Sequence, residues 1–279
     1  MEPIWTCPVC GQPLDVGQNP ARCPAGHCYD RARSGYWNLL PPSGRRSKQP
    51  GDNREMIAAR RQFLDSGRYL PLARMTAETA LEGLASPAAI LDAGCGEGYY
   101  SQVLTGLAQE QGLELQIAGA DISKVAVDKA ARRLPQGQWA VASLYNLPVL
   151  PGRFDVVLNL FAPHSPSQFA RVLAPGGRLV LALPGPRHLW ELKEFLYESP
   201  YPNPQETPEL PGFTPLECRR LTYAMELGNQ ALNLLFQMTP YYYKTPPEAK
   251  ARLAQCPGLT ATADFLVVSC KLEPAAALM

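Results

Sequence analysis

The sequence predicts an α/β fold on a mostly parallel sheet, preceded by a small cysteine-rich module. A short apolar run, residues 89–92, ends in an acid and leads into glycines at every second position and then into a helical pattern. This is the strand, loop and helix that open a nucleotide-type α/β domain. Apolar runs and helical patterns then alternate along the chain, which is typical of parallel sheets. The 279 residues leave room for one large domain and a small one.

The N-terminal module carries two pairs of residues with the spacing of a metal site. Cys7 and Cys10 form a C-x2-C pair, and after a gap of twelve residues Cys23 and His27 form a C-x3-H pair. Two such pairs suit tetrahedral zinc, so we expect these four residues to be its ligands, with Cys28 as the alternative to His27. The second pair argues against a redox C-x-x-C motif. A closed four-ligand site is structural rather than catalytic.

A basic segment follows this module. Nothing acidic lies between Arg31 and Asp52. The basic residues up to position 74 are Arg31, Arg33, Arg45, Arg46, Lys48, Arg54, Arg60, Arg61, Arg68 and Arg74. Such a surface favours a polyanionic partner, with a merely solvated face as the alternative. Aromatic residues between the arginines could stack bases, although we expect Trp37 and Leu39 to pack the module against its neighbour.

Two helices connect the basic segment to the sheet. The stretch over residues 42–52 is predicted to be a loop, and Asn53 is the expected cap of a helix over 54–67. A second helix follows residues 66–72 and ends before Pro87. The predicted division is a zinc module at 1–42, a linker with helices at 43–87 and a catalytic domain at 88–279.

The glycine loop resembles the cofactor loop of S-adenosylmethionine-dependent methyltransferases. It reads D-x-G-x-G-x-G over Asp92, Gly94, Gly96 and Gly98, which is shorter than the dinucleotide fingerprint. An acid at the strand end suits the methionine ammonium, and the loop N–H groups suit the carboxylate. A glycine-rich turn that only packs is the alternative.

A second acid, Asp121, ends the predicted strand over residues 115–120. We expect it to accept hydrogen bonds from both ribose hydroxyls of the cofactor. Its alternative role is to cap the helix over 124–133, for which Ser123 is better suited. Further strands are predicted at 138–143, 154–161, 177–183, 221–227 and 262–272, and helices at 187–197 and 229–238. Residues 201–215 are predicted to be an irregular lid or substrate loop, and Ser143 and Leu144 to contact the adenine.

No apolar run is long enough to span a bilayer, and the N-terminus lacks the features of a signal peptide. We therefore expect no membrane partner and a cytoplasmic location, where cysteines stay reduced and free to bind metal. The net charge of +1 is too small to indicate a class of binding partner.

Several stretches taken together resemble the zinc-containing 23S rRNA guanine-N1-methyltransferases, the RlmA family. They are CPVCG with CPAGH, GYWNLLP, PGDNREM, ARRQFLDSGRYLPL, LDAGCGEGYY, DISKVAVDKAARR, ARVLAPGGRLV, PGPRHLWELK and LLFQMTP. The resemblance covers most of the chain. It implies a seven-stranded, Rossmann-like class I methyltransferase sheet, a zinc module that recognises RNA, and methylation of N1 of one guanine in a 23S rRNA hairpin. Some members thereby confer resistance to macrolides such as tylosin. The resemblance also implies that the protein is a homodimer.

The same resemblance implies further cofactor contacts by motif position. These are Tyr69 in SGRYLPL, Gly98 and Tyr99 in GCGEGYY, and His188 in PGPRHL. From the residues alone, Tyr69 would be a packed aromatic and His188 a histidine at a helix start.

The catalytic base is not assigned from the sequence. Guanine N1 carries a proton at neutral pH, so some group must take it. His164, Glu97 and Asp155 are candidates by position only, and Asn159 could hold the base edge or satisfy the strand end. The alternatives to this function are a methyltransferase for another RNA, a protein or a small molecule, and a non-catalytic RNA-binding protein. The intact glycine loop disfavours the last.

We predict that replacing Arg45 and Arg46 by Ala weakens RNA binding and leaves S-adenosylmethionine binding unchanged. If each arginine neutralises one phosphate of a single-stranded loop, the slope of log K against log salt should fall by about 1.4. Filter binding over a salt series measures the slope. An RNA affinity equal to that of the wild type would contradict the assignment of these arginines.

Overall fold

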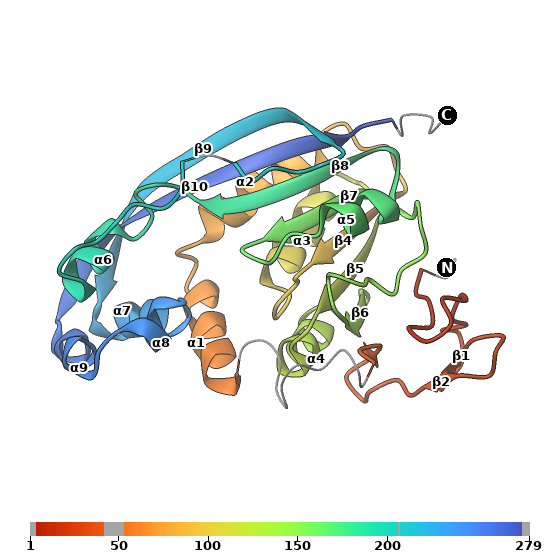
Figure 1. Ribbon diagram of the computed structural model, residues 1–279, viewed down its shortest axis with the longest axis horizontal. Coiled ribbons are helices and arrows are strands. Elements are labelled where there is room, and N and C mark those ends of the chain that lie inside the picture. The colour runs from red at the N-terminus through yellow and green to blue at the C-terminus, as the bar shows by residue number, and fades with distance from the viewer. Residues whose placement is uncertain (1–3, 42–52, 206, 275–279) are drawn as a thin grey trace.

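The computed structural model describes residues 4–41, 53–205 and 207–274. An eight-stranded sheet runs through the molecule in the order β3-β6-β5-β4-β7-β8-β10-β9, and β1 pairs with β2 separately (Figure 1). The strands are β1 (Ala21–Arg22), β2 (Cys28–Tyr29), β3 (Trp37–Asn38), β4 (Ala88–Ala93), β5 (Leu115–Asp121), β6 (Gln138–Val141), β7 (Phe154–Leu160), β8 (Leu173–Pro184), β9 (Phe213–Gly228) and β10 (Gly258–Leu272). The helices are α1 (Arg54–Asp65), α2 (Leu70–Leu81), α3 (Tyr99–Glu110), α4 (Lys124–Arg133), α5 (Pro166–Val172), α6 (Trp190–Leu196), α7 (Asn229–Gln237), α8 (Tyr241–Lys244) and α9 (Pro247–Gln255).

Parallel strands form the centre of the sheet because their sequences are apolar nearly throughout. Leu91 of β4 lies opposite Ala118 of β5 on one side and Val157 of β7 on the other. The predicted bounds of β4, β5, β6 and β7 are confirmed to within two residues at each end. Since parallel strands end at one edge of a sheet, the loops that follow them meet there.

The sheet has eight strands rather than the predicted seven, because the N-terminal module supplies an edge strand. β3 pairs in parallel with β6 through Trp37↔Ala140 and Asn38↔Val141. The predicted packing role of Trp37 and Leu39 is confirmed, since both side chains are buried. A base-stacking role for Trp37 is wrong, because only 3 % of this residue is exposed.

One hydrophobic cluster joins the N-terminal module to the sheet. Trp5 and Leu14 of the module pack in the same cluster as Leu91 and Ala140 of the sheet. In Figure 1 the module lies beyond the β6 edge, at the right. The boundary predicted between residues 42 and 43, with Arg45, Arg46 and Lys48, falls outside the described residues.

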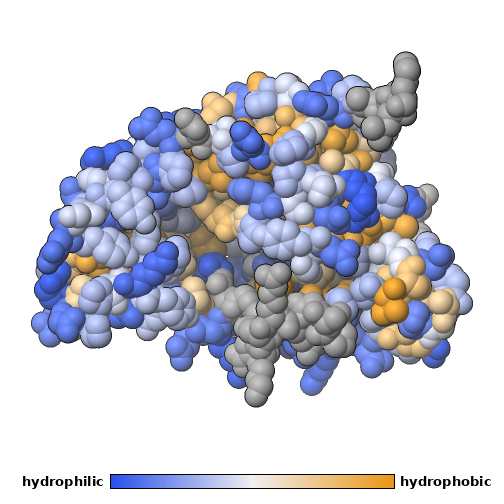
Figure 2. All heavy atoms as spheres, viewed as in Figure 1, coloured by the Kyte–Doolittle hydropathy of each residue, from blue (hydrophilic) through white to orange (hydrophobic). Residues whose placement is uncertain are grey.

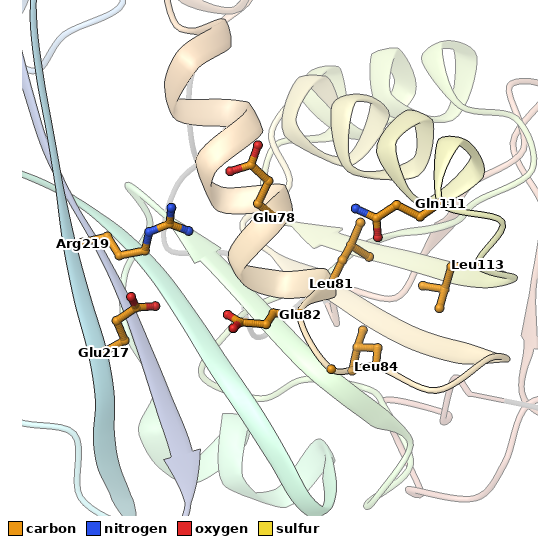
Figure 3. Close-up of a pocket in the computed structure, with 9 residues that line it drawn as sticks. Glu78, Leu81, Glu82, Leu84, Gln111, Leu113, Glu217 and Arg219 are labelled. Carbon is orange, nitrogen blue, oxygen red and sulfur yellow. The ribbon is translucent and has the colours of Figure 1, made fainter.

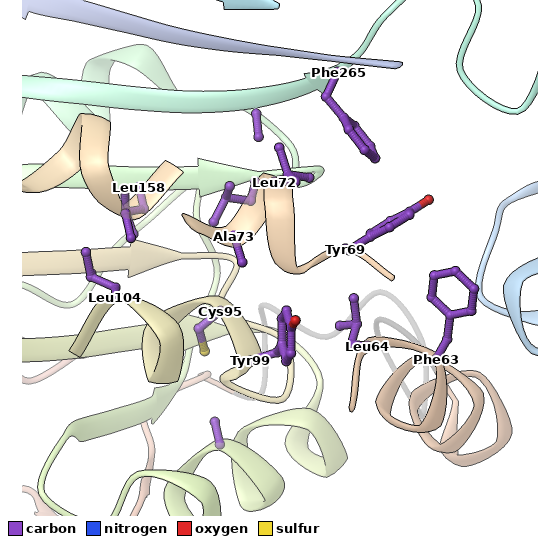
Figure 4. Packing of buried hydrophobic residues seen from close by; sticks show 14 of the residues in the cluster. Phe63, Leu64, Tyr69, Leu72, Ala73, Cys95, Tyr99, Leu104, Leu158 and Phe265 are labelled. Carbon is purple, nitrogen blue, oxygen red and sulfur yellow. The ribbon is translucent and has the colours of Figure 1, made fainter. Parts of the chain in front are cut away.

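The helices before β4, α1 and α2, pack in a second hydrophobic cluster, which includes Phe63, Leu72 and Ile90. The expected cap of α1 is confirmed, since the Asn53 side chain accepts a hydrogen bond from the Met56 amide at 2.9 Å. α1 ends at Asp65, two residues earlier than predicted, and Gly67 then takes a φ of +80°. Figure 4 shows Phe63 at the end of α1 close to Tyr69, which precedes α2.

A long antiparallel hairpin, β9 and β10, completes the sheet. Both strands extend beyond the predicted ranges, so residues 213–215 of the predicted lid belong to β9. α7, α8 and α9 connect the two strands and form a lobe with α6 at the left of Figure 1. The sequence prediction missed α5, α8 and α9, which are short or begin at proline.

Among the described residues, no helix combines the length and the apolar character needed to cross a membrane. Figure 2 shows hydrophilic side chains over most of one face, with a recess floored by hydrophobic ones between the α6–α9 lobe and the centre. Hydrophobic side chains also gather on the N-terminal module at the lower right, where Val9 is 65 % exposed.

Candidate functional site

The glycine loop lies at the carboxyl end of β4. The Gly94 amide donates to the Ala120 carbonyl at 2.8 Å, which ties the loop to the end of β5. Gly94 and Gly96 both have positive φ angles, +96° and +52°, that favour glycine. A Cβ on Gly94 would lie 2.4 Å from Cβ of Ala162, whereas one on Gly96 would meet nothing within 4 Å. Gly94 therefore serves packing, and Gly96 leaves open space beside the loop.

Asp92 is buried beneath this loop with one oxygen unpartnered. The Ser101 hydroxyl donates to Oδ2 at 2.5 Å, and Oδ1 makes no hydrogen bond within the described part of the chain. Burial raises the pKa of Asp92 to about 7, and the nearby Asp121 adds to the effect. A buried carboxylate oxygen without a partner fits a cationic ligand group, such as the ammonium of methionine.

Asp121 lies at the end of β5, next to the glycine loop. Its Oδ2 accepts from the Gly96 amide at 3.0 Å and its Oδ1 from the Ser123 amide at 2.8 Å. Ser123 caps α4 by accepting from the Ala126 amide. The cap thus belongs to Ser123, and Asp121 fixes the loop beside the expected ribose position.

Glu97 of the same loop forms a buried ion pair with Arg133. Its Oε2 lies 2.8 Å from Arg133, whose guanidinium also contacts Asp65 at 2.8 Å and stacks over the Tyr99 ring. Burial raises the pKa of Glu97, and Arg133 opposes that rise. Since only 2 % of Glu97 is exposed, its role is to hold α1, α4 and the loop together.

Tyr69 and His188, which only the family resemblance singled out, are brought together in the structure. The Tyr69 hydroxyl lies 3.4 Å from Nε2 of His188, and both side chains are buried against Phe265. Figure 4 shows Tyr69, Tyr99 and Phe265 projecting into one region from the starts of α2 and α3 and from β10. This region adjoins Cys95 of the glycine loop.

The protonation state of His188 follows from its contacts. Nδ1 accepts from the Asp264 amide at 3.3 Å, so the proton of the neutral ring lies on Nε2. Burial lowers the pKa of His188 to about 3, which keeps the ring neutral at physiological pH. Nε2–H then donates to the Tyr69 oxygen, and the Tyr69 O–H remains available to a ligand.

Asp264 positions the His188 loop, and the sequence analysis did not identify it. Its carboxylate accepts from both Nε and a terminal nitrogen of Arg220 at 2.8 and 2.9 Å, and from the Arg187 amide at 2.9 Å. Although burial opposes it, these bonds and Thr222 hold the pKa of Asp264 below its usual range. The sequence feature that could have identified Asp264 is its position as an acid within the mostly apolar run that forms β10.

Asn159 and His164 meet at the end of β7. The Asn159 amide nitrogen donates to the Ala93 carbonyl at 2.8 Å and to that of Pro163 at 3.2 Å. Its oxygen lies 2.7 Å from Nδ1 of His164. Asn159 is fully buried, so it satisfies the strand end, and its alternative role at the edge of a substrate base is wrong.

The Cys and His side chains of the N-terminal module form a compact cluster. The ligand atoms of Cys7, Cys10, Cys23 and His27 all lie within 4.8 Å of one another. Nδ1 of His27 lies 3.3 Å from Sγ of Cys23 and 3.6 Å from that of Cys7, and the Cys10–Cys23 sulfurs are 3.6 Å apart. Tetrahedral zinc implies edges of roughly 3.5 Å for N···S and 3.8 Å for S···S, so this geometry fits the metal. Cys28 instead donates to the Gly26 carbonyl.

Hydrogen bonds favour the thiolate form of Cys7. The Tyr29 hydroxyl lies 3.2 Å from Sγ of Cys7. Although burial alone would raise it, hydrogen bonds from Tyr29 and the backbone at Val9 and Cys10 lower the pKa of Cys7 to about 6. Thiolates are the form that binds zinc.

A cavity of about 680 Å³ lies away from these groups. Figure 3 shows Glu78 of α2, Glu82 at the C-cap of that helix, Gln111 after α3, and Glu217 and Arg219 of β9 around it. Leu113, which precedes β5, places this cavity at the amino edge of the parallel strands. Ligands of such sheets bind at the opposite edge, so we assign this cavity no part in the site.

Two family models match the chain. A zinc-ribbon model described as "RlmA, N-terminal" matches residues 5–48, and one described as "Methyltransferase domain" matches residues 90–177. The first contains the Cys and His cluster, and the second begins inside β4 and contains the glycine loop.

Curated relatives cover nearly the whole chain. A protein of Streptomyces fradiae named 23S rRNA (guanine(748)-N(1))-methyltransferase is 36 % identical and covers 91 % of each chain. A candidate 23S rRNA (guanine-N(1)-)-methyltransferase of Bacillus subtilis, YxjB, is 31 % identical over 94 % of each chain. A third, from Micromonospora griseorubida, is 38 % identical over 70 % of each chain.

Solved structures share the fold of the sheet domain. The YcgJ protein of Bacillus subtilis matches with a TM-score of 0.50 at 13 % identity, over 73 % of this chain and 98 % of that one. A candidate methyltransferase of Bacillus halodurans matches with the same score and identity, over 72 % and 99 %.

We predict opposite effects of Asp92→Asn on stability and on ligand binding. With a folded pKa near 7 against about 3.8 in the unfolded chain, native Asp92 holds a proton that the unfolded chain releases between pH 4 and 7. The stability that this proton contributes is lost as pH rises through that window. Asn does not titrate, so the variant does not lose this stability. The ligand-free variant should therefore be more stable at pH 8, by up to about 4 kcal/mol, and equally stable at pH 4.

S-adenosylmethionine affinity should fall about 10- to 100-fold in the same variant, because Asn cannot pair with the ammonium charge. Thermal unfolding and titration calorimetry measure the two effects. Asp128→Asn on the outer side of α4 is the control and should retain full affinity. Unchanged affinity in Asp92→Asn would refute the pairing.

Replacing Cys23 by Ser should remove bound zinc and destabilise the N-terminal module, since the metal holds it together. S-adenosylmethionine affinity should stay within about threefold of the wild type, because the glycine loop makes no hydrogen bond to the module among the described residues. Cys28→Ser, next to the cluster, is the matched control and should keep one zinc per chain. Elemental analysis decides; equal zinc loss in both variants would overturn the ligand set.

Proposed function

The chain belongs to the family of 23S rRNA (guanine-N1)-methyltransferases, and from this premise we propose that it transfers a methyl group from S-adenosylmethionine to N1 of one guanine in 23S rRNA. The observation that carries this proposal is the 36 % identity to the Streptomyces fradiae enzyme over 91 % of both chains. The matches to the zinc-ribbon model and to the methyltransferase-domain model place both parts in one chain, a combination that a small-molecule methyltransferase would not need.

S-adenosylmethionine supplies the methyl group on a positively charged sulfur. We propose that Asp92 holds the ammonium of its methionine part, that the loop amide after Gly96 holds the carboxylate, and that Asp121 holds the ribose hydroxyls. The unpartnered oxygen of Asp92 and the open space over Gly96 support these roles. Positioning of the reacting atoms accounts for much of the rate in a displacement of this kind.

The second part of the cofactor site is aromatic. We propose that Gly98 and Tyr99 on one side and Tyr69 and His188 on the other complete the contacts with S-adenosylmethionine. The available O–H of Tyr69 and the neutral, immobile ring of His188 support this assignment. Asp264 acts through His188 as a positioning residue.

The N-terminal module is proposed to bind the RNA. Cys7, Cys10, Cys23 and His27 would hold zinc and so keep the module folded, while the basic segment contacts phosphates. We propose that the chain divides into residues 1–42, 43–87 and 88–279, that the target is a hairpin and that the protein is a homodimer. A ribosomal substrate would place the reaction in the cytoplasm.

The target guanine must leave its stack to reach the methyl group. A loop or hairpin suits this better than a continuous helix, because unstacking a base costs less where it is not paired on both sides. This supports a hairpin as the recognised element.

The first experiment is methyl transfer from labelled S-adenosylmethionine to unmodified 23S rRNA, followed by primer extension. An N1-methylated guanine cannot form a Watson–Crick pair, so reverse transcription stops next to it. We expect one stop in a hairpin, and its distance from guanine 748, named for the Streptomyces fradiae relative, identifies the base.

Transfer RNA and a small-molecule acceptor serve as controls for the substrate class. Incorporation into transfer RNA alone, or no incorporation into either RNA by protein that binds S-adenosylmethionine, would overturn the proposed acceptor and leave the cofactor assignment standing.

A further inference from the structure

We propose that His164 is the general base that removes the N1 proton of the target guanine. This inference rests on the proposed function, because it concerns the same reaction. Three features support it: the hydrogen bond that fixes its ring, the nitrogen that this bond leaves available, and its loop, which packs on the cofactor loop.

The orientation of Asn159 sets the state of His164. Two backbone carbonyls, those of Ala93 and Pro163, lie 2.8 and 3.2 Å from one end of the Asn159 amide. A carbonyl oxygen at that end would repel both, so this end is the NH2 group. The other end is therefore the oxygen, which lies 2.7 Å from Nδ1 of His164 and can only accept.

His164 must therefore carry its proton on Nδ1. In the neutral ring this leaves a lone pair on Nε2, and that nitrogen makes no hydrogen bond in the part of the chain that the structure describes. Burial lowers the pKa of His164, so the ring is neutral near pH 7 and able to accept a proton. The side chain is half-buried, which leaves it within reach of a substrate.

The other candidates are engaged elsewhere. Asp155 accepts from the Ala89 amide at 2.8 Å, near the amino end of β4 and so away from the cofactor loop. Glu97 is buried in its ion pair with Arg133. Both ring nitrogens of His188 are used, by the Asp264 amide and by Tyr69. Glu97 keeps one oxygen without a hydrogen bond, but it is only 2 % exposed. Among these four side chains of the described residues, only His164 combines an available basic atom, a half-buried side chain and a place beside the cofactor loop.

The loop that carries His164 lies against the cofactor loop. Ala162, two residues before it, closes on Gly94, and Asn159 bonds to Ala93. Phe161, at the start of the same loop, is 44 % exposed and has a φ of +53°. Its ring lies 5.8 Å from that of Phe265, which contacts both Tyr69 and His188. Phe161 thus offers an exposed aromatic face beside His164, on which an unstacked base can lie.

Nε2 of His164 takes the proton from guanine N1, and the N1 electron pair forms the bond to the methyl carbon. The bond between that carbon and sulfur breaks, and its electron pair stays on sulfur, giving S-adenosylhomocysteine. The imidazolium of His164 then loses its proton to solvent, so each turnover releases one proton.

The test compares His164→Gln, His164→Ala and wild-type full-length enzyme on unmodified 23S rRNA. Loss of a general base costs about 10²–10⁴-fold, so kcat should fall at least 100-fold in both variants. KM for the RNA and the affinity for S-adenosylmethionine should stay within about threefold, since neither binding step uses Nε2. Imidazole added to His164→Ala should restore part of kcat, a result that a purely structural role does not produce.

Phe161→Leu is the matched control on the same loop. It keeps His164, so its effect should fall on KM for the RNA, and imidazole should not change it. Failure of the wild type to methylate guanine N1 would refute the proposed function itself. An active wild type with His164→Gln within threefold of it, or a His164→Ala that binds both ligands but gains nothing from imidazole, would overturn the role of His164.

Discussion

The absence of a side chain at Gly94 is the constraint on which both halves of the site depend. A side chain there would collide with Ala162, so the loops after β4 and β7 can approach only because this position is glycine. The approach brings the groups expected to hold the cofactor next to the groups expected to face the substrate. Asn159 secures it with a hydrogen bond to Ala93. The order of the central strands, with β4 beside β7, makes this possible.

Around this contact, buried polar groups act as fixed supports. Asp264 holds the turn that carries His188, and the Glu97–Arg133 pair holds α1 and α4 to the glycine loop. A buried ion pair of this kind contributes little net stability, because removing two charges from water offsets their attraction. Its effect is to set positions, which is what a site that aligns two substrates requires.

The central strands, the glycine loop and the four-residue metal cluster could be predicted from the sequence, because each has a local signature in the order of residues. Tyr69 and His188 were reached only through the resemblance, since their meeting depends on β10 and its Phe265. The eighth strand was missed because two residues, Trp37 and Asn38, carry too little pattern to indicate pairing with β6. The protonation state of His164 could not be predicted either, since it depends on where the Asn159 amide finds its partners.

The pairing of β3 with β6 also determines how the polypeptide can be divided. Without its first forty residues, β6 would become the edge of the sheet and present unpaired N–H and C=O groups next to Ala140 and Ala142, which the module now covers. Open edges of this kind recruit strands from other chains, and natural proteins cover or shorten them. The N-terminal module therefore covers an edge at which strands of other chains could pair. We expect a fragment that begins after β3 to aggregate even where its cofactor site is intact.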